Sequence, residues 1–215
     1  MPNTLFFTFP NDDLTLSYLY SYEKEVVRFA QQRGVSVTEF KREKATRKVV
    51  EKFLKAKNPD LVVFNGHGDE NTVTGYRQEP IIIRGENESL LDSSIVYSIS
   101  CSSAKRLGPS AVEKGAKAFI GYSDDFVFLF DKNRTATPLK DEIAKNFLEP
   151  SNALVVSLLK GNNIQESFDS SQKSFQKKID RLLSSEAMPG TESLIAFLVW
   201  DKIVQVFHGD GNASF

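Results

Sequence analysis

Residues 61–68, LVVFNGHG, carry the clearest indication of the fold in this chain. Its first four residues form a continuous apolar run, which is typical of a central parallel strand with both faces covered. His67 follows this run between two glycines, which let the backbone turn sharply. Residues 95–103, IVYSISCSS, repeat the pattern with a cysteine in place of the histidine. Because parallel strands end at the same edge of a sheet, the two runs predict that His67 and Cys101 face each other across a crevice.

Strand-like and helix-like segments alternate on both sides of these two runs. Short β-favouring runs predict further strands at 4–9, 35–40 and 117–122. Apolar residues at helical spacing predict helices between the strands and again over 139–182. Two late apolar stretches, 194–200 and 203–207, predict an antiparallel hairpin on the sheet edge. The sum is an α/β fold with a mostly parallel central sheet, helices on both faces and an antiparallel C-terminal hairpin.

Length and charge narrow the classes of partner and compartment. The 215 residues suit one domain over residues 1–215. The net charge of −1, from 27 basic and 28 acidic residues, gives no reason to expect a nucleic acid or an anionic membrane as partner. No apolar run approaches the roughly 18 residues of a membrane span, and the first residues lack the pattern of a signal peptide. We therefore expect a cytoplasmic protein.

Cys101 is the only cysteine of the chain, so an internal disulfide is excluded. A lone cysteine is most often a buried hydrophobic residue. Its position favours chemistry instead, because small hydroxyl residues surround it, and Ser102 or Ser103 is a suitable cap for a helix over 104–112. The N-terminus of a helix lowers the pKa of a thiol. We therefore expect Cys101 to be a reactive thiol.

Two histidines are candidates for the base that would serve this thiol. For His67 the alternative interpretation is a neutral histidine whose ring is hydrogen-bonded within a turn and has no catalytic role. His208 would give the cysteine-then-histidine order of papain-like and glutamine-amidotransferase-like enzymes. The latter need very small residues two positions on each side of the nucleophile, where this chain has Ile99 and Ser103. We therefore expect His67 to be the base and His208 to end an edge strand.

Three segments together resemble the caspase-like cysteine peptidases of clan CD. They are the strand that ends in His67-Gly68, the strand that ends in SCSSA at 100–104, and GAKAFIGY at 115–122. The segments FLVWD (197–201) and VFHGD (206–210) are also similar to the closing hairpin of CHAT and gingipain-type domains. The interval of 34 residues from His67 to Cys101 is shorter than the roughly 50 of caspases, and the caspase signature around the cysteine is absent. The chain therefore resembles CHAT and gingipain members more than caspases.

The resemblance implies a caspase-like three-layer sandwich that acts as an endopeptidase on a protein or peptide substrate. Cys101 would be the nucleophile and His67 the base, and the N–H groups of Gly68 and Cys101 would stabilise the oxyanion. Family members often lack a third residue that orients the histidine, and Asn65 and Asp69 are the nearest candidates for that role. We expect no cofactor and no metal.

Acidic residues after the strand at 117–122 are candidates for substrate binding. They are Asp124, Asp125 and Asp131. Gingipains and separases recognise a basic residue of the substrate through an acidic group, so the resemblance implies a preference for Arg or Lys over Asp before the cleaved bond. The alternative interpretation is that these are ordinary solvated loop acids.

Two other functions remain open from the sequence. One is a catalytically inactive caspase-like scaffold or binding subunit, because a fold alone does not fix a function. The other is an amidotransferase or similar hydrolase that uses Cys101 with His208. For an active peptidase we expect restraint by a regulatory protein partner, a ligand or internal cleavage, with residues 184–190 and 69–89 as the moving or cleaved segments.

Overall fold

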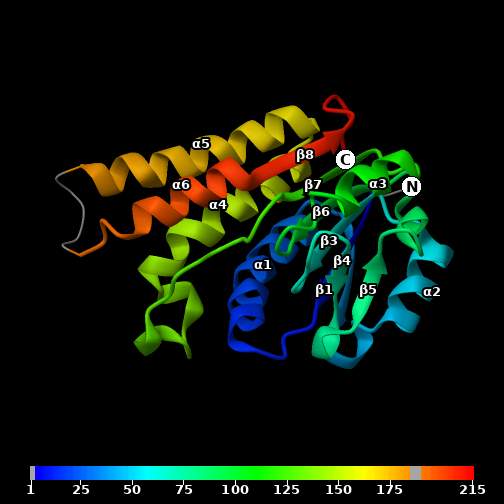
Figure 1. Ribbon diagram of the computed structural model, residues 1–215, viewed down its shortest axis with the longest axis horizontal. Coiled ribbons are helices and arrows are strands. Elements are labelled where there is room, and N and C mark those ends of the chain that lie inside the picture. Colours follow the sequence, from blue (N-terminus) through cyan, green and yellow to red (C-terminus); the bar gives the residue numbers. More distant parts are fainter. Residues whose placement is uncertain (1–2, 185–189) are drawn as a thin grey trace.

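A six-stranded sheet runs through the residues that the computed structural model describes, 3–184 and 190–215 (Figure 1). In spatial order its strands are β2 (Ser36–Lys41), β1 (Thr4–Phe9), β3 (Leu61–Asn65), β6 (Ile95–Ile99), β7 (Ala118–Tyr122) and β8 (Gln205–Gly209). The first five strands are parallel, and β8 pairs with β7 in the antiparallel direction. The predicted α/β class with a mostly parallel sheet is therefore confirmed.

Helices cover both faces of the sheet, which makes three layers (Figure 1). One face packs against α1 (Leu14–Gln32) and α4 (Glu142–Leu159), and the other packs against α2 (Arg47–Lys57) and α3 (Leu107–Glu113). All five residues of β3 are buried, because alternate side chains enter the two separate cores. The continuous apolar run of residues 61–64 is thus explained by its central position.

Two further helices extend α4 into a helical arm beside the sheet (Figure 1). They are α5 (Ile164–Leu183) and α6 (Leu194–Val204), and they pack against α4 and each other around a third apolar cluster that includes Phe147, Phe175 and Leu198. None of the helices in the described ranges is long and apolar enough to cross a membrane.

The C-terminal region differs from the prediction in one element. The apolar stretch 194–200, predicted as a strand, is the beginning of α6, and the antiparallel partner of β8 is β7. The buried positions of α6 include Leu194, Leu198 and Asp201, which share one side of a helix. Its exposed side is also apolar, so apolar residues do not recur at helical spacing in the sequence of this segment.

The long excursion between β3 and β6 is packed into the fold. It contains the small hairpin of β4 (Thr72–Thr74) and β5 (Pro80–Ile83), and it buries Val73, Ile81 and Ile82 against α2. Of the two segments predicted to move or be cleaved, residues 69–89 are thus attached to the core through these three buried side chains. In the other segment, 184–190, residues 185–189 lie outside the described residues.

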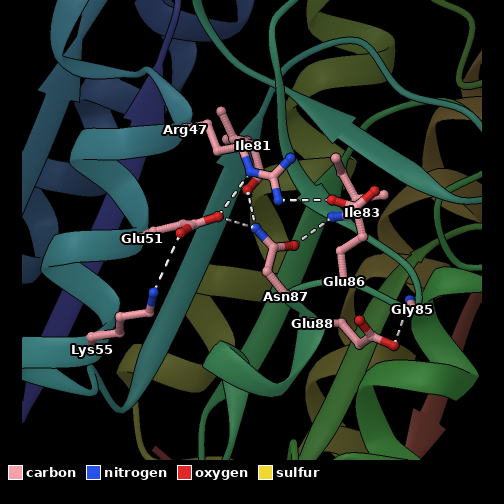
Figure 2. A network of polar contacts seen from close by, with 9 residues as sticks. All are labelled: Arg47, Glu51, Lys55, Ile81, Ile83, Gly85, Glu86, Asn87 and Glu88. Carbon is pink, nitrogen blue, oxygen red and sulfur yellow. Dashed lines mark hydrogen bonds and ion pairs between the residues drawn. The ribbon is translucent and has the colours of Figure 1, made fainter.

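Polar contacts hold this excursion to α2 (Figure 2). Asn87 donates to Glu51 Oε1 of α2 and to the carbonyl of Ile81, at 2.9 Å each, and it accepts the N–H of Ile83 at 2.7 Å. Arg47 of α2 forms ion pairs with Glu51 and with Glu86, both at 2.8 Å. The hydrogen bonds of Arg47 and Asn87 lower the pKa of Glu51 to about 2.

Candidate active site

His67 and Cys101 follow two neighbouring strands at the carboxyl edge of the sheet, at equivalent positions. Strands β3 and β6 pair in register up to Asn65 and Ile99, and the N–H of Gly66 then donates to the carbonyl of Ile99 at 3.4 Å. His67 and Cys101 each follow two residues after that last pair. The structure therefore brings both residues to the same edge, as the sequence predicted.

The imidazole of His67 is held by a carboxylate that the sequence analysis missed. His67 Nε2 lies 2.6 Å from Asp13 Oδ2. The other oxygen of Asp13 accepts the N–H of Leu16 at 2.8 Å, so the same side chain caps the N-terminus of α1. Asp13 reaches His67 because β1 is the neighbour of β3, so its following loop lies beside the His67 turn.

Neither residue predicted to orient His67 is hydrogen-bonded to it in the described structure. Asn65 is buried: its backbone N–H donates to Thr8 Oγ1 at 3.2 Å, and its side-chain amide makes no hydrogen bond with the described residues. Asp69 accepts the N–H groups of Asn71 and Thr72, at 2.7 and 2.9 Å, and so closes its own turn. The sequence feature that could have indicated Asp13 is the polar cluster PNDD at 10–13, because it follows a strand that ends at the same edge of the sheet as the His67 strand.

Cys101 begins a series of turns over residues 101–106, and α3 starts only at Leu107. The prediction that Cys101 lies at the N-terminus of a helix is therefore wrong. Hydrogen bonds fix the turns to the end of β7, from the N–H of Ser102 to the carbonyl of Asp124 at 2.9 Å and from Ala104 to Tyr122 at 3.0 Å. Ser102 has a φ of 56°, which a residue with a side chain rarely adopts.

Three buried serines support the turn that carries Cys101. The hydroxyls of Ser98 and Ser100 lie 2.6 Å apart, and Ser103 lies 3.0 Å from each of them. Each hydroxyl can donate one hydrogen bond and accept others, so a closed ring satisfies all three. The small hydroxyl residues around Cys101 therefore brace the turn from below.

Burial raises the pKa of the Cys101 thiol, and the negative charge of Asp125 adds to the effect. The thiol is partly buried, and its sulfur lies 4.0 Å from the carbonyl of Phe126. This direction is opposite to the lowered pKa that the predicted helix dipole would have produced. The resting group is accordingly a protonated thiol at neutral pH.

The predicted oxyanion donors are available in the structure. Within residues 3–184 and 190–215, neither the N–H of Gly68 nor that of Cys101 donates to another residue. A side chain at Gly68 would lie 2.7 Å from the carbonyl of Thr72 and 3.0 Å from Ser100, so this position requires glycine. The close approach places the Gly68 backbone directly beside the strand end that leads to Cys101.

The segment 123–131 forms one wall of the site and is fixed to α6. The N–H of Ser123 donates to the carbonyl of Val204 at 2.8 Å, and the N–H of Val127 donates to Asp201 Oδ1 at 2.9 Å. Burial raises the pKa of Asp201 to about 8, and its Oδ2 makes no hydrogen bond with the described residues. The wall therefore depends on a buried, protonated carboxyl group.

The predicted substrate-binding acids occupy different places along this wall. Asp124 and Asp125 are exposed and lie beside the Cys101 turn, where the charge of Asp125 affects the thiol. Asp131 lies beside Asp141, the N-cap of α4: its N–H donates to Asp141 Oδ2 at 2.8 Å, and its carboxylate accepts the N–H of Asn133 at 2.9 Å. Asp125 is therefore the acid most directly connected to the thiol.

His208 has a structural contact of its own. It lies in β8, opposite Phe119 of β7, and its Nε2 is 2.7 Å from the carbonyl of Ala104. The ring nitrogen must carry the proton in this contact, because a carbonyl only accepts.

In the described part of the chain no group of three or more histidine, cysteine or acidic side chains is placed to bind a metal ion.

Comparisons with known proteins agree on the fold. No protein-family profile matches the chain, and no curated protein matches it in sequence. Among solved structures it is similar to the Arg-specific cysteine proteinase gingipain R (RgpB), with a TM-score of 0.62 and 12% identity over 99% of this chain. It is also similar to the complex of the pro- and mature domains of Porphyromonas gingivalis RgpB, with a TM-score of 0.61 and 10% identity over 98% of this chain. This chain spans 47% of each of those two chains.

Proposed function

We propose that this chain is a cysteine endopeptidase of the caspase-like type, formed by a single domain, with Cys101 as nucleophile and His67 as base. The observation that carries the proposal is the exit of both residues from paired strands at one sheet edge, with His67 bonded to Asp13. The fold shared with gingipain R supports the same chemistry. The relation to CHAT domains stays a prediction from the sequence.

The contact with Asp13 assigns the two nitrogens of His67 different tasks. Nε2 carries a proton toward the carboxylate, so Nδ1 is the nitrogen left to exchange protons with the reactants. Asp13 would then fix the orientation of the ring and stabilise the imidazolium that forms during the reaction. In this scheme Asp13 takes the orienting role for which the sequence had suggested Asn65 or Asp69.

The reaction begins when the thiol of Cys101 loses its proton to His67 and the sulfur attacks a peptide carbonyl. The N–H groups of Gly68 and Cys101 stabilise the resulting oxyanion. His67 returns the proton to the leaving amine, which leaves an acyl-enzyme. His67 then takes a proton from water, and the hydroxide releases the acid product and frees the sulfur.

Basic substrate residues are the proposed specificity, with Asp124 and Asp125 beside the nucleophile and Asp131 further along the wall. A carboxylate near the cleaved bond attracts Lys or Arg and repels Asp. The test is a fluorogenic peptide panel that varies only the residue before the cleaved bond. Fastest turnover on Arg or Lys supports the proposal, and fastest turnover on Asp rejects this specificity.

The activity itself is tested with three variants in the same assay. Cys101→Ala and His67→Ala are expected to abolish cleavage, while His208→Ala should retain it. Peptide cleavage that survives Cys101→Ala would reject the proposed mechanism. Loss of activity in His208→Ala with retention in His67→Ala would instead favour the amidotransferase-like pairing.

An inactive caspase-like scaffold is the second candidate, because the raised pKa of Cys101 leaves little thiolate at neutral pH. A purified chain that cleaves no peptide in the panel, at any pH from 6 to 9, would favour it.

We further propose that a regulatory protein partner controls the active form. One of the similar structures is a complex of pro- and mature domains, which supports this last point only by analogy.

A further inference from the structure

Helix α6 presents an uncharged apolar face to solvent. Its exposed large side chains are Phe197, Val199, Trp200 and Ile203. Ile203 is 69% exposed, and Trp200 is 41% exposed. The two charged residues of the helix lie away from this face or at its margin, since Asp201 is buried and Lys202 is partly buried. Contiguous exposed apolar side chains of this kind mark interaction surfaces.

This face is continuous with the wall of the candidate active site. The indole N–H of Trp200 donates to the carbonyl of Asp125 at 2.8 Å, and the next residue, Asp201, holds the N–H of Val127. Asp125 in turn lies close enough to Cys101 for its charge to raise the pKa of the thiol. A chain bound on α6 would therefore lie next to the nucleophile.

The size of the face decides between two kinds of occupant. An 11-residue helix is about 16 Å long and roughly 10 Å wide, so the face offers on the order of 160 Å². A stable dimer needs about 800 Å² from each partner, which is several times more. The length of the face matches about five residues of an extended chain. A short apolar segment fits this surface better than a second copy.

We propose that α6 is an exosite that binds an extended apolar segment of the polypeptide cleaved at Cys101. This inference rests on the proposed peptidase function. Trp200 is the expected anchor, because its indole N–H is already bonded and its ring is held in place for contact. Val199 and Ile203, four positions apart, form an apolar row beside it on the exposed face.

The experiment measures peptide binding without catalysis. The Cys101→Ala chain is titrated into two fluorescein-labelled peptides that share an Arg-containing core. One peptide carries about five Leu and Val residues after the core, and the other carries about five Ser and Asn residues. Val199→Ser/Ile203→Ser removes apolar area from the exosite. Leu183→Ser is the matched control, because Leu183 is 68% exposed but ends α5 at the tip of the helical arm (Figure 1).

The apolar peptide is expected to bind about tenfold more tightly than the polar one, and the double variant should remove that difference. Leu183→Ser should leave it intact. Equal binding of the two peptides, or an unchanged preference in the double variant, would overturn the exosite. A dimer in sedimentation, or binding to phosphatidylcholine vesicles, that the double variant abolishes would assign the face to those occupants and also overturn it. If the wild type cleaves the peptide panel but Cys101→Ala binds both labelled peptides equally, only the exosite is refuted. If Cys101→Ala binds the apolar peptide more tightly but the wild type cleaves no peptide of the panel, the peptidase is refuted.

Discussion

Asp13 shows how much of a site depends on residues that are distant in sequence. It lies 54 positions before His67, in the loop after β1, and it reaches the imidazole only because β1 pairs with β3. The sequence identified His67 and Cys101 because each follows a buried apolar strand. The sequence did not identify Asp13, since an acidic residue before a helix is common as an N-cap.

Asp13→Asn tests this contact at the residue scale. Asn keeps the oxygen that caps α1 but removes the charge that stabilises the imidazolium. We expect kcat/KM for peptide cleavage to fall by roughly 100-fold, with most of the loss in kcat. Asp12→Asn is the neighbouring control, because Asp12 accepts the N–H of Arg77 and does not contact His67. Equal losses in both variants would show that loop geometry, rather than the charge on His67, is responsible.

The pH dependence of Cys101 follows from its raised pKa. Only the thiolate reacts with iodoacetamide, so the alkylation rate should rise with pH and reach half its maximum above the ordinary thiol value of about 8.5. Asp125→Asn removes a negative charge that disfavours the thiolate, so its midpoint should move to lower pH. Asp92→Asn, near the amino end of β6, should leave the profile unchanged. A wild-type midpoint below pH 7 would contradict the burial of this thiol.

At the scale of elements, the sequence identified the parallel strands better than the segments near the site. Continuous apolar runs located β3 and β6, because central strands are buried on both faces. The same rule misassigned the first part of α6, whose apolar residues also cover its exposed side. The helix expected to begin beside Cys101 starts at Leu107, because hydrogen bonds to the end of β7 hold residues 101–106 in turns.

Asn87→Ala tests whether the excursion after His67 is a fixed element. The change leaves the carbonyl of Ile81 and the N–H of Ile83 without their side-chain partner in a buried place. We expect a loss of roughly 2 to 4 kcal/mol in the free energy of unfolding by urea. Glu86→Ala removes only an exposed ion pair with Arg47 and should cost less than about 1 kcal/mol. Similar small losses in both variants would mean that the excursion contributes little to the fold.

For the whole molecule, the alternation of strands and helices in the sequence predicted the three-layer architecture. The sequence was a poorer guide to which side chains are buried. Glu23 is fully buried on α1, and neither of its oxygens has a hydrogen-bond partner among the described residues. Burial raises its pKa to about 8. Nothing in the sequence of α1 marks Glu23, because an acidic residue within an amphipathic helix normally faces solvent.

The raised pKa of Glu23 makes the stability of the whole protein depend on pH. Between about pH 4 and pH 8 the unfolded chain ionises this carboxyl while the folded chain keeps its proton, so the free energy of unfolding falls as pH rises. Glu23→Gln removes this term, and we expect it to gain roughly 3 kcal/mol relative to the wild type between pH 5 and pH 8. Glu25→Gln, exposed on the same helix, should follow the wild-type profile. Parallel stability curves for Glu23→Gln and the wild type would refute the buried carboxyl.

If Cys101 is a nucleophile served by His67, a peptidyl acyloxymethyl ketone with a basic residue should label it, and the labelling should depend on His67. Intact-protein mass spectrometry at pH 8 would measure the rate of adduct formation in the wild type, His67→Ala and His208→Ala. We expect one adduct on Cys101 in the wild type and His208→Ala, and at least 100-fold slower labelling in His67→Ala. Equal labelling rates in all three proteins, or no adduct on the wild type, would contradict this role of Cys101.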